Sequence, residues 1–251
     1  MKDTQTAYKP FEIFGETRPG RWCITCDHAA NTVPDFVNNG DLGVAPPDMA
    51  RHIAWDIGAA GVAQALGVLL DSPVILSNFS RLVIDPNRGL DDPTLLMRLY
   101  DGTIIPANRH ADDADLNTRL ERCYHPYHAA LERLSARPGA TLLSIHSFTP
   151  RLNGRSLRPW EVGILYSHQD ARLAQALLHR LHEEPDLTIG ENEPYSGHLP
   201  GDAVDRHALQ HGRPNALIEL RNDLIADEAG QNHWAARLAP ILDETLKASD
   251  L

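Results

Sequence analysis

The sequence predicts a single α/β domain in which a mainly parallel mixed sheet lies between two layers of helices. Short apolar, β-branched segments alternate with longer segments whose apolar residues recur every three or four positions. Such alternation is typical of β-α-β units, which build a parallel sheet through right-handed crossovers. With 251 residues, 42% of them hydrophobic, the chain can bury one large core and requires no second domain.

The first half of the chain contains three predicted strands and one predicted helix. Residues 23–28 form an apolar run that turns polar at its end, which indicates a buried strand reaching the edge of a sheet. Residues 48–70 carry apolar side chains at helical spacing and predict a crossover helix. Two short β-branched runs, 73–77 and 81–85, predict the next strands.

The second half of the chain continues this alternation. Helices are indicated where apolar residues recur at helical spacing, and strands where apolar residues run together for four or more positions. A bend at Pro126 is expected in the first of these helices, because proline removes a backbone donor. The helices are expected at residues 115–136, 170–182, 202–211 and 227–248, and the strands at 141–145, 161–166 and 215–220.

Two segments of the predicted domain, which spans residues 1–251, are expected to be irregular. Residues 1–20 are polar and interrupted by proline and glycine, so they predict an extended N-terminal segment. Residues 86–112 are rich in Pro, Gly, Asp and Asn around a small apolar cluster. Loops of this length are usually functional, so we expect an active-site loop there.

Charge and hydropathy exclude several classes of partner. The chain has 23 Lys and Arg against 34 Asp and Glu, a net charge of −11, and no run of five like charges. A general nucleic-acid or anionic-membrane surface is therefore not expected. No segment reaches 18 consecutive apolar residues, and no apolar core follows a basic start, so neither a membrane span nor a signal peptide is expected.

The cysteines are sparse and odd in number. Cys23, Cys26 and Cys123 cannot form a disulfide framework, so a cytoplasmic protein is expected. The first two form a C-x-x-C motif inside a predicted strand, where their spacing directs the side chains to opposite faces. Core packing is therefore the favoured interpretation of this motif.

Polar side chains at the ends of several predicted strands indicate a metal site. His28 follows the first strand, His146 follows the strand at 141–145, and Glu219 interrupts an apolar strand. The carboxyl ends of parallel strands meet at one edge of a sheet, where ligands usually bind. The sequence thus predicts two imidazoles and a carboxylate around one pocket, a set of residues typical of metallohydrolases.

A catalytic zinc ion needs a third protein ligand, for which there are three candidates. Asn31 follows His28 closely, and His52 and Asp56 are four residues apart on a predicted helix, where both could face the site. One of them could bind the metal while another orients it. The alternative for His52 and Asp56 is a surface ion pair.

The remaining candidates are a carboxylate and a group of polar residues. Glu219 lies in an otherwise apolar strand, so it must be paired, bind a metal or act as a general base. A structural salt bridge with Arg221 or another arginine is the alternative. Arg81, Asn87 and Arg88 cluster in one segment and suggest a carboxylate clamp, with simple surface exposure as the alternative.

Five blocks of the sequence, in this order, resemble the N-formylglutamate amidohydrolase family. That family is similar in fold to the zinc carboxypeptidases and aspartoacylases, so the resemblance implies a zinc-exopeptidase-like (phosphorylase/hydrolase-like) fold. It covers about residues 20 to 240, and five ordered blocks are more specific than any single one. The blocks are residues 26–34, 52–59, 80–88, 146–150 with 158–160, and 218–225.

The resemblance also implies roles for individual residues. His28 and His146 would be zinc ligands and Glu219 the catalytic base, while Arg81 would polarise the scissile carbonyl. In the zinc carboxypeptidases the first ligand pair is His-x-x-Glu, whereas here Asn31 stands at the second position. The other candidate roles are Asp56 as the favoured third ligand, Asn31 and His52 as orienting residues or alternative ligands, and Asn87 and Arg88 as the grip on a substrate carboxylate.

The activity implied by the resemblance is zinc-dependent hydrolysis of a linear amide, with another divalent metal as the alternative cofactor. The substrate would be a small carboxylate-bearing molecule, an N-acyl amino acid such as N-formylglutamate. Two other functions fit the same residues. One is a zinc peptidase or amidase acting on a peptide or cell-wall fragment, and the other is a carboxylate-binding protein that has lost catalysis.

Overall fold

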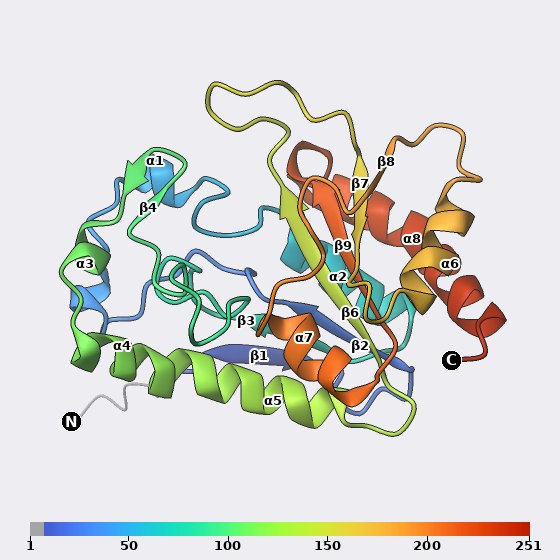
Figure 1. Cartoon of the computed structure of the whole chain (residues 1–251), viewed down its shortest axis with the longest axis horizontal. Coiled ribbons are helices and arrows are strands. Elements are labelled where there is room, and N and C mark those ends of the chain that lie inside the picture. Colours follow the sequence, from blue (N-terminus) through green and yellow to red (C-terminus); the bar gives the residue numbers. More distant parts are fainter. Residues whose placement is uncertain (1–7) are drawn as a thin grey trace.

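A seven-stranded mixed sheet forms the middle layer of the computed structural model, which describes residues 8–251 (Figure 1). Its strands are β1 (Phe11–Phe14), β2 (Trp22–Cys26), β3 (Val74–Ser77), β6 (Thr141–Phe148), β7 (Val162–Leu165), β8 (Ile189–Glu191) and β9 (Asn215–Arg221). They lie in the order β1-β3-β2-β6-β9-β7-β8. The four central strands are parallel, while β1 pairs antiparallel with β3 and β7 antiparallel with β9. The mainly parallel mixed sheet is therefore confirmed.

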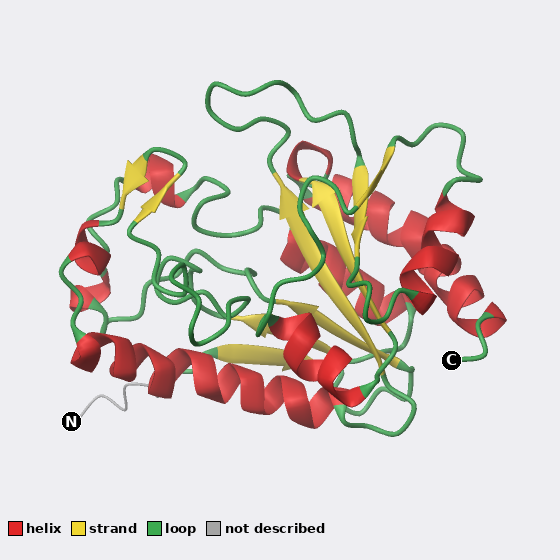
Figure 2. Cartoon of the chain, in the orientation of Figure 1, coloured by secondary structure: helices red, strands yellow, loops and turns green. Residues whose placement is uncertain are grey.

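Helices cover both faces of this sheet, which completes the predicted three layers (Figure 2). On one face lie α2 (Ala59–Leu69), α6 (Arg172–Leu181) and α8 (Glu228–Ala248). On the other face lie α5 (His125–Ser135) and α7 (Ala203–His207), with α4 (Asp113–Arg119) leading into α5 through a π-helical turn at Leu120–Tyr124. The remaining elements are α1 (Pro46–Met49), α3 (Pro106–Arg109), the hairpin of β4 (Leu99–Tyr100) and β5 (Thr103–Ile104), and 3-10 turns at Asn38–Gly40, Leu209–His211 and Asn222–Leu224.

Two apolar clusters, one on each face of the sheet, form the core. Successive residues of a strand point to opposite faces, so Cys23 belongs to the cluster beneath α5, whereas Cys26 belongs to the cluster beneath α2 and α8. Both cysteines, and Cys123, are buried and free. The C-x-x-C motif therefore packs in the core, as predicted.

The predicted continuous helix at residues 48–70 is wrong. Residues 50–58 form turns between α1 and α2. The carbonyl of Ala54 accepts hydrogen bonds from the Ser80 hydroxyl at 2.8 Å and from the Arg81 backbone N–H at 3.2 Å. Because residues 80 and 81 bind this carbonyl, it does not accept a hydrogen bond from within an α-helix. Side chains in residues 50–58 therefore do not follow helical spacing.

The predicted strand at residues 81–85 is also wrong. The segment forms a turn, in which the backbone N–H of Val83 donates to the carbonyl of Ser80 at 2.8 Å. Its side chains Leu82, Val83 and Ile84 are fully buried in the cluster beneath α5. A short buried apolar run fits a core loop as well as a strand, which is why periodicity alone failed here.

Some elements were not predicted. Strand β1 lies within the segment expected to be extended, whose residues 1–7 are outside the described residues. Strand β8 falls in a segment that carried no strand pattern. The loop at 86–112 contains α3 and the β4–β5 hairpin, and its residues Asn87, Arg88 and Tyr100 line the cavity that also contains His28 and His146. No helix among residues 8–251 is long and apolar enough to cross a membrane.

Gly58 precedes α2 in a left-handed conformation, and its replacement tests the turn that separates α1 from α2. Its φ is +80°, and a Cβ there would lie 2.0 Å from the carbonyl oxygen of Ile225. We expect Gly58→Ala to lower the free energy of unfolding by about 2–4 kcal/mol, since left-handed strain and overpacking add. Urea unfolding followed by circular dichroism measures this loss.

Gly212→Ala is the matched control. Gly212 also has a positive φ, +63°, but a Cβ there would meet no atom within 4 Å. Its replacement should therefore cost only the backbone strain, about 1 kcal/mol. Equal losses of unfolding free energy in the two variants would contradict the expected clash between a Cβ at residue 58 and the Ile225 carbonyl.

Candidate active site

The carboxyl ends of the central strands bring four predicted site residues together. His28 follows β2, and His146 lies inside β6, which continues to Phe148 instead of ending at residue 145. Residues His146 and Glu219 are register partners on the parallel strands β6 and β9, so their side chains project from the same face. The backbone N–H of Asp56 donates to the carbonyl of His28 at 2.9 Å, which holds Asp56 beside this edge.

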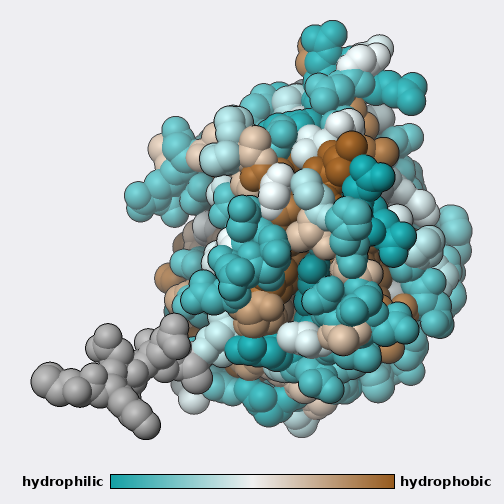
Figure 3. Space-filling model, turned by 90° about the vertical axis from the view of Figure 1, so that its left-hand side faces the viewer, coloured by the Kyte–Doolittle hydropathy of each residue, from teal (hydrophilic) through white to brown (hydrophobic). Residues whose placement is uncertain are grey.

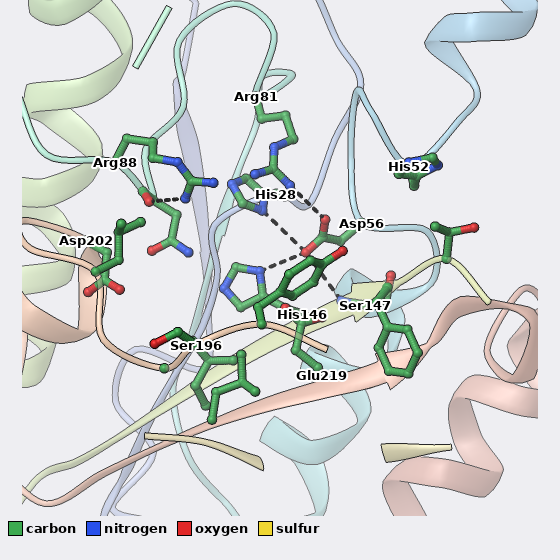
Figure 4. A pocket seen from close by; sticks show the side chains of 18 of the residues that line it. His28, His52, Asp56, Arg81, Arg88, His146, Ser147, Ser196, Asp202 and Glu219 are labelled. Carbon is green, nitrogen blue, oxygen red and sulfur yellow. Dashed lines mark hydrogen bonds and ion pairs between the residues drawn. The ribbon is translucent and has the colours of Figure 1, made fainter. Parts of the chain in front are cut away.

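Two histidines point the same ring nitrogen at one carboxylate oxygen (Figure 4). The Nδ1 atoms of His28 and His146 lie 3.3 Å and 2.7 Å from Oδ2 of Asp56. Ligand atoms of these three buried residues all lie within 4.8 Å of one another. Imidazole nitrogens and a carboxylate oxygen in such a cluster are suited to a divalent metal, zinc among them.

Each histidine has a second carboxylate on its other ring nitrogen. Asp85 Oδ1 lies 2.7 Å from His28 Nε2, and Asp27 Oδ2 lies 3.3 Å from His146 Nε2. Asp85 is placed to hold the proton of His28 on Nε2 and to leave its Nδ1 lone pair free, as is usual for histidines that bind metals. Nε2 of His146 lies near Asp27 but has no hydrogen-bond partner among the described residues. The residues present therefore fit a metal, and the contacts of Asp85 with His28 and of Asp27 with His146 were not predicted from the sequence.

The buried carboxylates of the cluster favour a positive charge among them. Burial alone would raise the pKa of Asp56, but His28 and His146 hold that pKa far below its usual value. Burial alone would lower the pKa of His146, yet its contacts with Asp27 and Asp56 raise the pKa well above its usual value. Without a metal, His146 therefore tends to hold a proton, whose positive charge lies between Asp27 and Asp56. A bound metal would supply positive charge at the same place.

Glu219 is buried beside this cluster without a salt bridge. Its side chain is 7% exposed, and among the described residues its Oε2 atom has no hydrogen-bond partner. Burial, reinforced by the charge of Asp56, raises the pKa of Glu219 to about 7, although His146 opposes the shift. The predicted alternative partner, Arg221, instead pairs with Glu161 and Asp223. An unpaired carboxylate of this kind can accept a proton near neutral pH.

A cavity of about 260 Å³ opens over these residues. The protein surface in Figure 3 is mainly hydrophilic and is hollowed near its centre. The size suits a small molecule or part of one. The polar side chains that line the cavity include His28, Asp56, Arg81, Asn87, Arg88, His146, Asp202 and Glu219.

Arg81 lies on the wall of the cavity and is held by carboxylates. Its Nε and Nη2 atoms donate to Asp85 Oδ2 at 3.2 Å and 2.9 Å, and Nη1 reaches Asp56 Oδ1 at 3.5 Å. Its guanidinium also lies 5.5 Å from the centre of the Tyr100 ring. The side chain is therefore fixed next to the candidate metal ligands.

Asn87 and Arg88 lie at one end of the cavity. Oδ1 of Asn87 accepts from the backbone N–H of Ala203 at 3.1 Å, which leaves its amide N–H groups for a ligand. Arg88 donates through Nε to Thr94 Oγ1 at 3.1 Å and through Nη1 to the carbonyl of Asn87 at 2.7 Å. Since Arg88 pairs with no carboxylate in the described part of the chain, its charge remains available to an anion.

The other two ligand candidates do not join the cluster. Asn31 is exposed, and its amide donates to the carbonyl of Met49 at 2.9 Å, so it does not reach the cavity. His52 lines the cavity on the side away from Arg88 (Figure 4), 3.6 Å from Asp101 Oδ2. His52 and Asp56 do not share a helical face, because residues 50–58 form turns and not a helix.

Comparison with solved structures shows that other proteins share this fold. A gene product of Agrobacterium tumefaciens is 33% identical, with a TM-score of 0.89 and 96% of each chain covered. The N-formylglutamate amidohydrolase of Ralstonia eutropha is 23% identical over 96% of this chain and 97% of that one, with a TM-score of 0.65. A bacteriophage poly-γ-glutamate hydrolase, 9% identical over 97% and 91%, has a TM-score of 0.51. The last two comparisons show a shared fold.

The family assignment comes from the sequence itself. No curated protein matches the chain. The sequence profile described as N-formylglutamate amidohydrolase, however, matches residues 20–226, a span that contains the candidate ligands, Glu219 and the Asn87–Arg88 segment. The chain therefore belongs to the N-formylglutamate amidohydrolase family.

Proposed function

We propose that the protein is a metal-dependent amidohydrolase that cleaves the acyl amide of an N-acyl amino acid such as N-formylglutamate. One observation carries the proposal: the Nδ1 atoms of two histidines and the carboxylate of Asp56 converge beside the unpaired carboxylate of Glu219. Family membership supports amide hydrolysis. The small cavity above these groups supports a small-molecule substrate.

Zinc, or another divalent cation, would be held by His28, Asp56 and His146. Bound there, such a cation lowers the pKa of water and withdraws electron density from the acyl carbonyl. Asp85 keeps the imidazole of His28 in the tautomer that such binding requires, and the negative charge of Asp27 lies 3.3 Å from Nε2 of His146. Three protein ligands leave room for water and substrate, as is usual for catalytic zinc.

Glu219 serves as the general base and then as the general acid. Its carboxylate takes a proton from the water that attacks the acyl carbon, and it returns that proton to the leaving nitrogen as the C–N bond breaks. Arg81, fixed by Asp85, offers its remaining N–H groups to the negative charge that develops on the carbonyl oxygen. Asn87 and Arg88 bind the carboxylate of the amino-acid half.

Two other functions fit the same residues: binding of carboxylates without catalysis, and hydrolysis of a peptide or cell-wall fragment. A protein that only bound carboxylates would have no use for the unpaired, buried Glu219, so we favour catalysis. A peptide or cell-wall fragment would use the same site, and relative turnover of peptides and N-acyl amino acids separates the two activities.

The three free, buried cysteines favour a reducing compartment, and we propose the cytoplasm.

Removal of the metal tests the proposed function. We expect chelation to reduce hydrolysis of N-formylglutamate and related N-acyl amino acids at least about 100-fold, and added zinc to restore it, because charge stabilisation by the metal is lost. Metal analysis before and after chelation accompanies the assay. Equal rates for metal-stripped and zinc-loaded protein would contradict the mechanism.

Substitution of the proposed base tests the role of Glu219. Glu219→Gln keeps the size of the side chain but cannot accept the proton, so kcat should fall roughly 10²–10⁴-fold while zinc content is unchanged. Asp56→Asn is the matched comparison, since it should lose zinc as well as activity. Retention of more than a tenth of kcat in Glu219→Gln would argue against a catalytic base.

Substitution of Arg88 tests the carboxylate clamp. Arg88→Ala should raise KM for N-acyl amino acids about 10–100-fold, because a charge-assisted contact contributes about 1.5–3 kcal/mol. Arg98→Ala is the control, since Arg98 belongs to the same loop but is exposed and does not line the cavity. An unchanged KM in Arg88→Ala would mean that this arginine does not bind the substrate.

A further inference from the structure

A buried tyrosine, Tyr124, contacts the proposed carboxylate clamp from outside the cavity. Its hydroxyl donates to the backbone carbonyl of Arg88 at 2.6 Å, and its side chain is fully buried. Tyr124 does not line the cavity, and the proposed reaction does not use it. Among residues 8–251 this hydroxyl is the only hydrogen-bond donor to that carbonyl. The backbone of the clamp arginine therefore depends on one side chain of the helix layer.

Tyr124 is the last residue of the π-helical turn between α4 and α5. In this turn the backbone N–H of His125 donates to the carbonyl of Leu120, five residues earlier. Pro126 follows at once and has no backbone N–H with which to continue an α-helical pattern. Turns of this kind are rare and are frequently found at functional sites. The turn thus coincides with the contact between this helix layer and the clamp.

Arg206 of α7 holds the same hydroxyl from the other side. Its Nη1 atom donates to Tyr124 Oη at 2.6 Å, and within residues 8–251 it forms no salt bridge. Because Oη accepts from Arg206, its own proton is directed to the Arg88 carbonyl, and a hydrogen bond next to a cation is stronger than a neutral one. Burial raises the pKa of Tyr124, although the charge of Arg206 opposes the shift, so the hydroxyl keeps its proton.

Two further contacts join the clamp to α7 and to the segment that leads into it. The backbone N–H of Ala203 donates to Asn87 Oδ1 at 3.1 Å. A Cβ on Gly201 would lie 2.7 Å from Cα of Gly89, so the two backbones touch. Three successive residues, 87–89, are thus held from the side of α7, which leaves the cavity side to a ligand.

We propose that Tyr124 and Arg206 are positioning residues that hold Arg88 in the orientation that binds the carboxylate of the substrate. The proposal rests on the proposed function. Arginine binds a carboxylate through two parallel hydrogen bonds from a planar fork, so a small displacement of its backbone misaligns both bonds. Neither positioning residue touches the substrate. Loss of the relay should therefore weaken carboxylate binding without slowing the chemical step.

Tyr124→Phe removes the hydroxyl and keeps the ring. We expect KM of the zinc-loaded protein for N-formylglutamate to rise about 3–10-fold, the range of one lost hydrogen bond, while kcat and zinc content stay within about 2-fold. A fall in kcat without a rise in KM, or an unchanged KM, would overturn the proposal.

Two variants of Arg206 test the other half of the relay. Arg206→Ala should raise KM by a factor similar to that of Tyr124→Phe, because the hydroxyl loses its cationic donor. Arg206→Lys keeps a cationic N–H donor, so it should recover most of the loss. A KM in Arg206→Lys as high as in Arg206→Ala would overturn the role assigned to Arg206.

A double-mutant cycle tests whether Tyr124 acts through Arg88. In an Arg88→Ala background the side chain that Tyr124 positions is absent, so Tyr124→Phe should change KM less than about 2-fold there. A purely structural effect of the lost hydroxyl would multiply KM by the same factor in both backgrounds. Equal factors would therefore overturn the proposal.

Tyr166→Phe is the matched control. Tyr166 is also buried, and its hydroxyl also donates at 2.6 Å, to Glu191 Oε1, but neither residue lines the cavity. Its substitution should leave KM unchanged even where it lowers the melting temperature. A rise in KM equal to that of Tyr124→Phe would assign the effect to general destabilisation and overturn the proposal.

Binding of free glutamate, a product of the proposed reaction, separates this proposal from the proposed function. Calorimetry on the zinc-loaded protein measures its Kd without turnover. A Kd that rises about 3–10-fold in Tyr124→Phe, but not further in the Arg88→Ala background, supports the positioning role even if no N-acyl amino acid is hydrolysed. An equal Kd in the wild type and in Tyr124→Phe overturns that role even if hydrolysis is normal.

Discussion

The site depends on the burial of negative charge. Asp27, Asp56 and Asp85 are almost fully buried, and the two imidazoles of His28 and His146 lie among them. A buried carboxylate is tolerated only when it is paired, and Arg81 supplies one permanent cation, against Asp85 and Asp56. The electrostatic balance of the whole arrangement therefore favours a further positive charge between the histidines, which is what a metal provides.

The scaffold fixes this arrangement through one helix layer and through the register of the sheet. Asp27 accepts hydrogen bonds from the hydroxyls of Tyr127 on α5 and Thr25 on β2, at 2.5 Å and 3.0 Å. The parallel register of β6 and β9 sets Glu219 beside His146. Helix packing thus fixes the carboxylate of Asp27 near His146, and backbone pairing within the sheet positions Glu219, so neither carboxylate depends on a flexible surface loop.

The parts of the site that the sequence predicted are those marked by a break in a local pattern. His28, His146 and Glu219 stand out because each ends or interrupts an apolar run. The contacts of Asp27 with His146 and of Asp85 with His28 could not be predicted from a local pattern, because the two residues of each pair are far apart in the sequence. Asp27 did give one signal, a charged residue at the end of a buried strand, directly before a histidine.

The parts of the fold that could be predicted are likewise those that local sequence patterns mark. The alternation of apolar segments predicted the layers and the central strands, since burial of regular elements repeats along the sequence. The helix at 48–70 failed because Ser80 and Arg81, far along the chain, occupy the carbonyl of Ala54. The position of Asp56 beside His28 and His146 therefore depends on this distant contact and not on helical spacing.

Asp202 is both a helix cap and a cavity residue. As the N-cap of α7 it stabilises the helix, and its side chain also lines the cavity. Asparagine, serine and threonine are also good N-caps but carry no charge. Substitutions among these residues would change the charge of the cavity wall at little cost to the fold. The candidate metal ligands lie on other elements, so the charge at this end of the cavity can change while the cluster of His28, Asp56 and His146 stays the same.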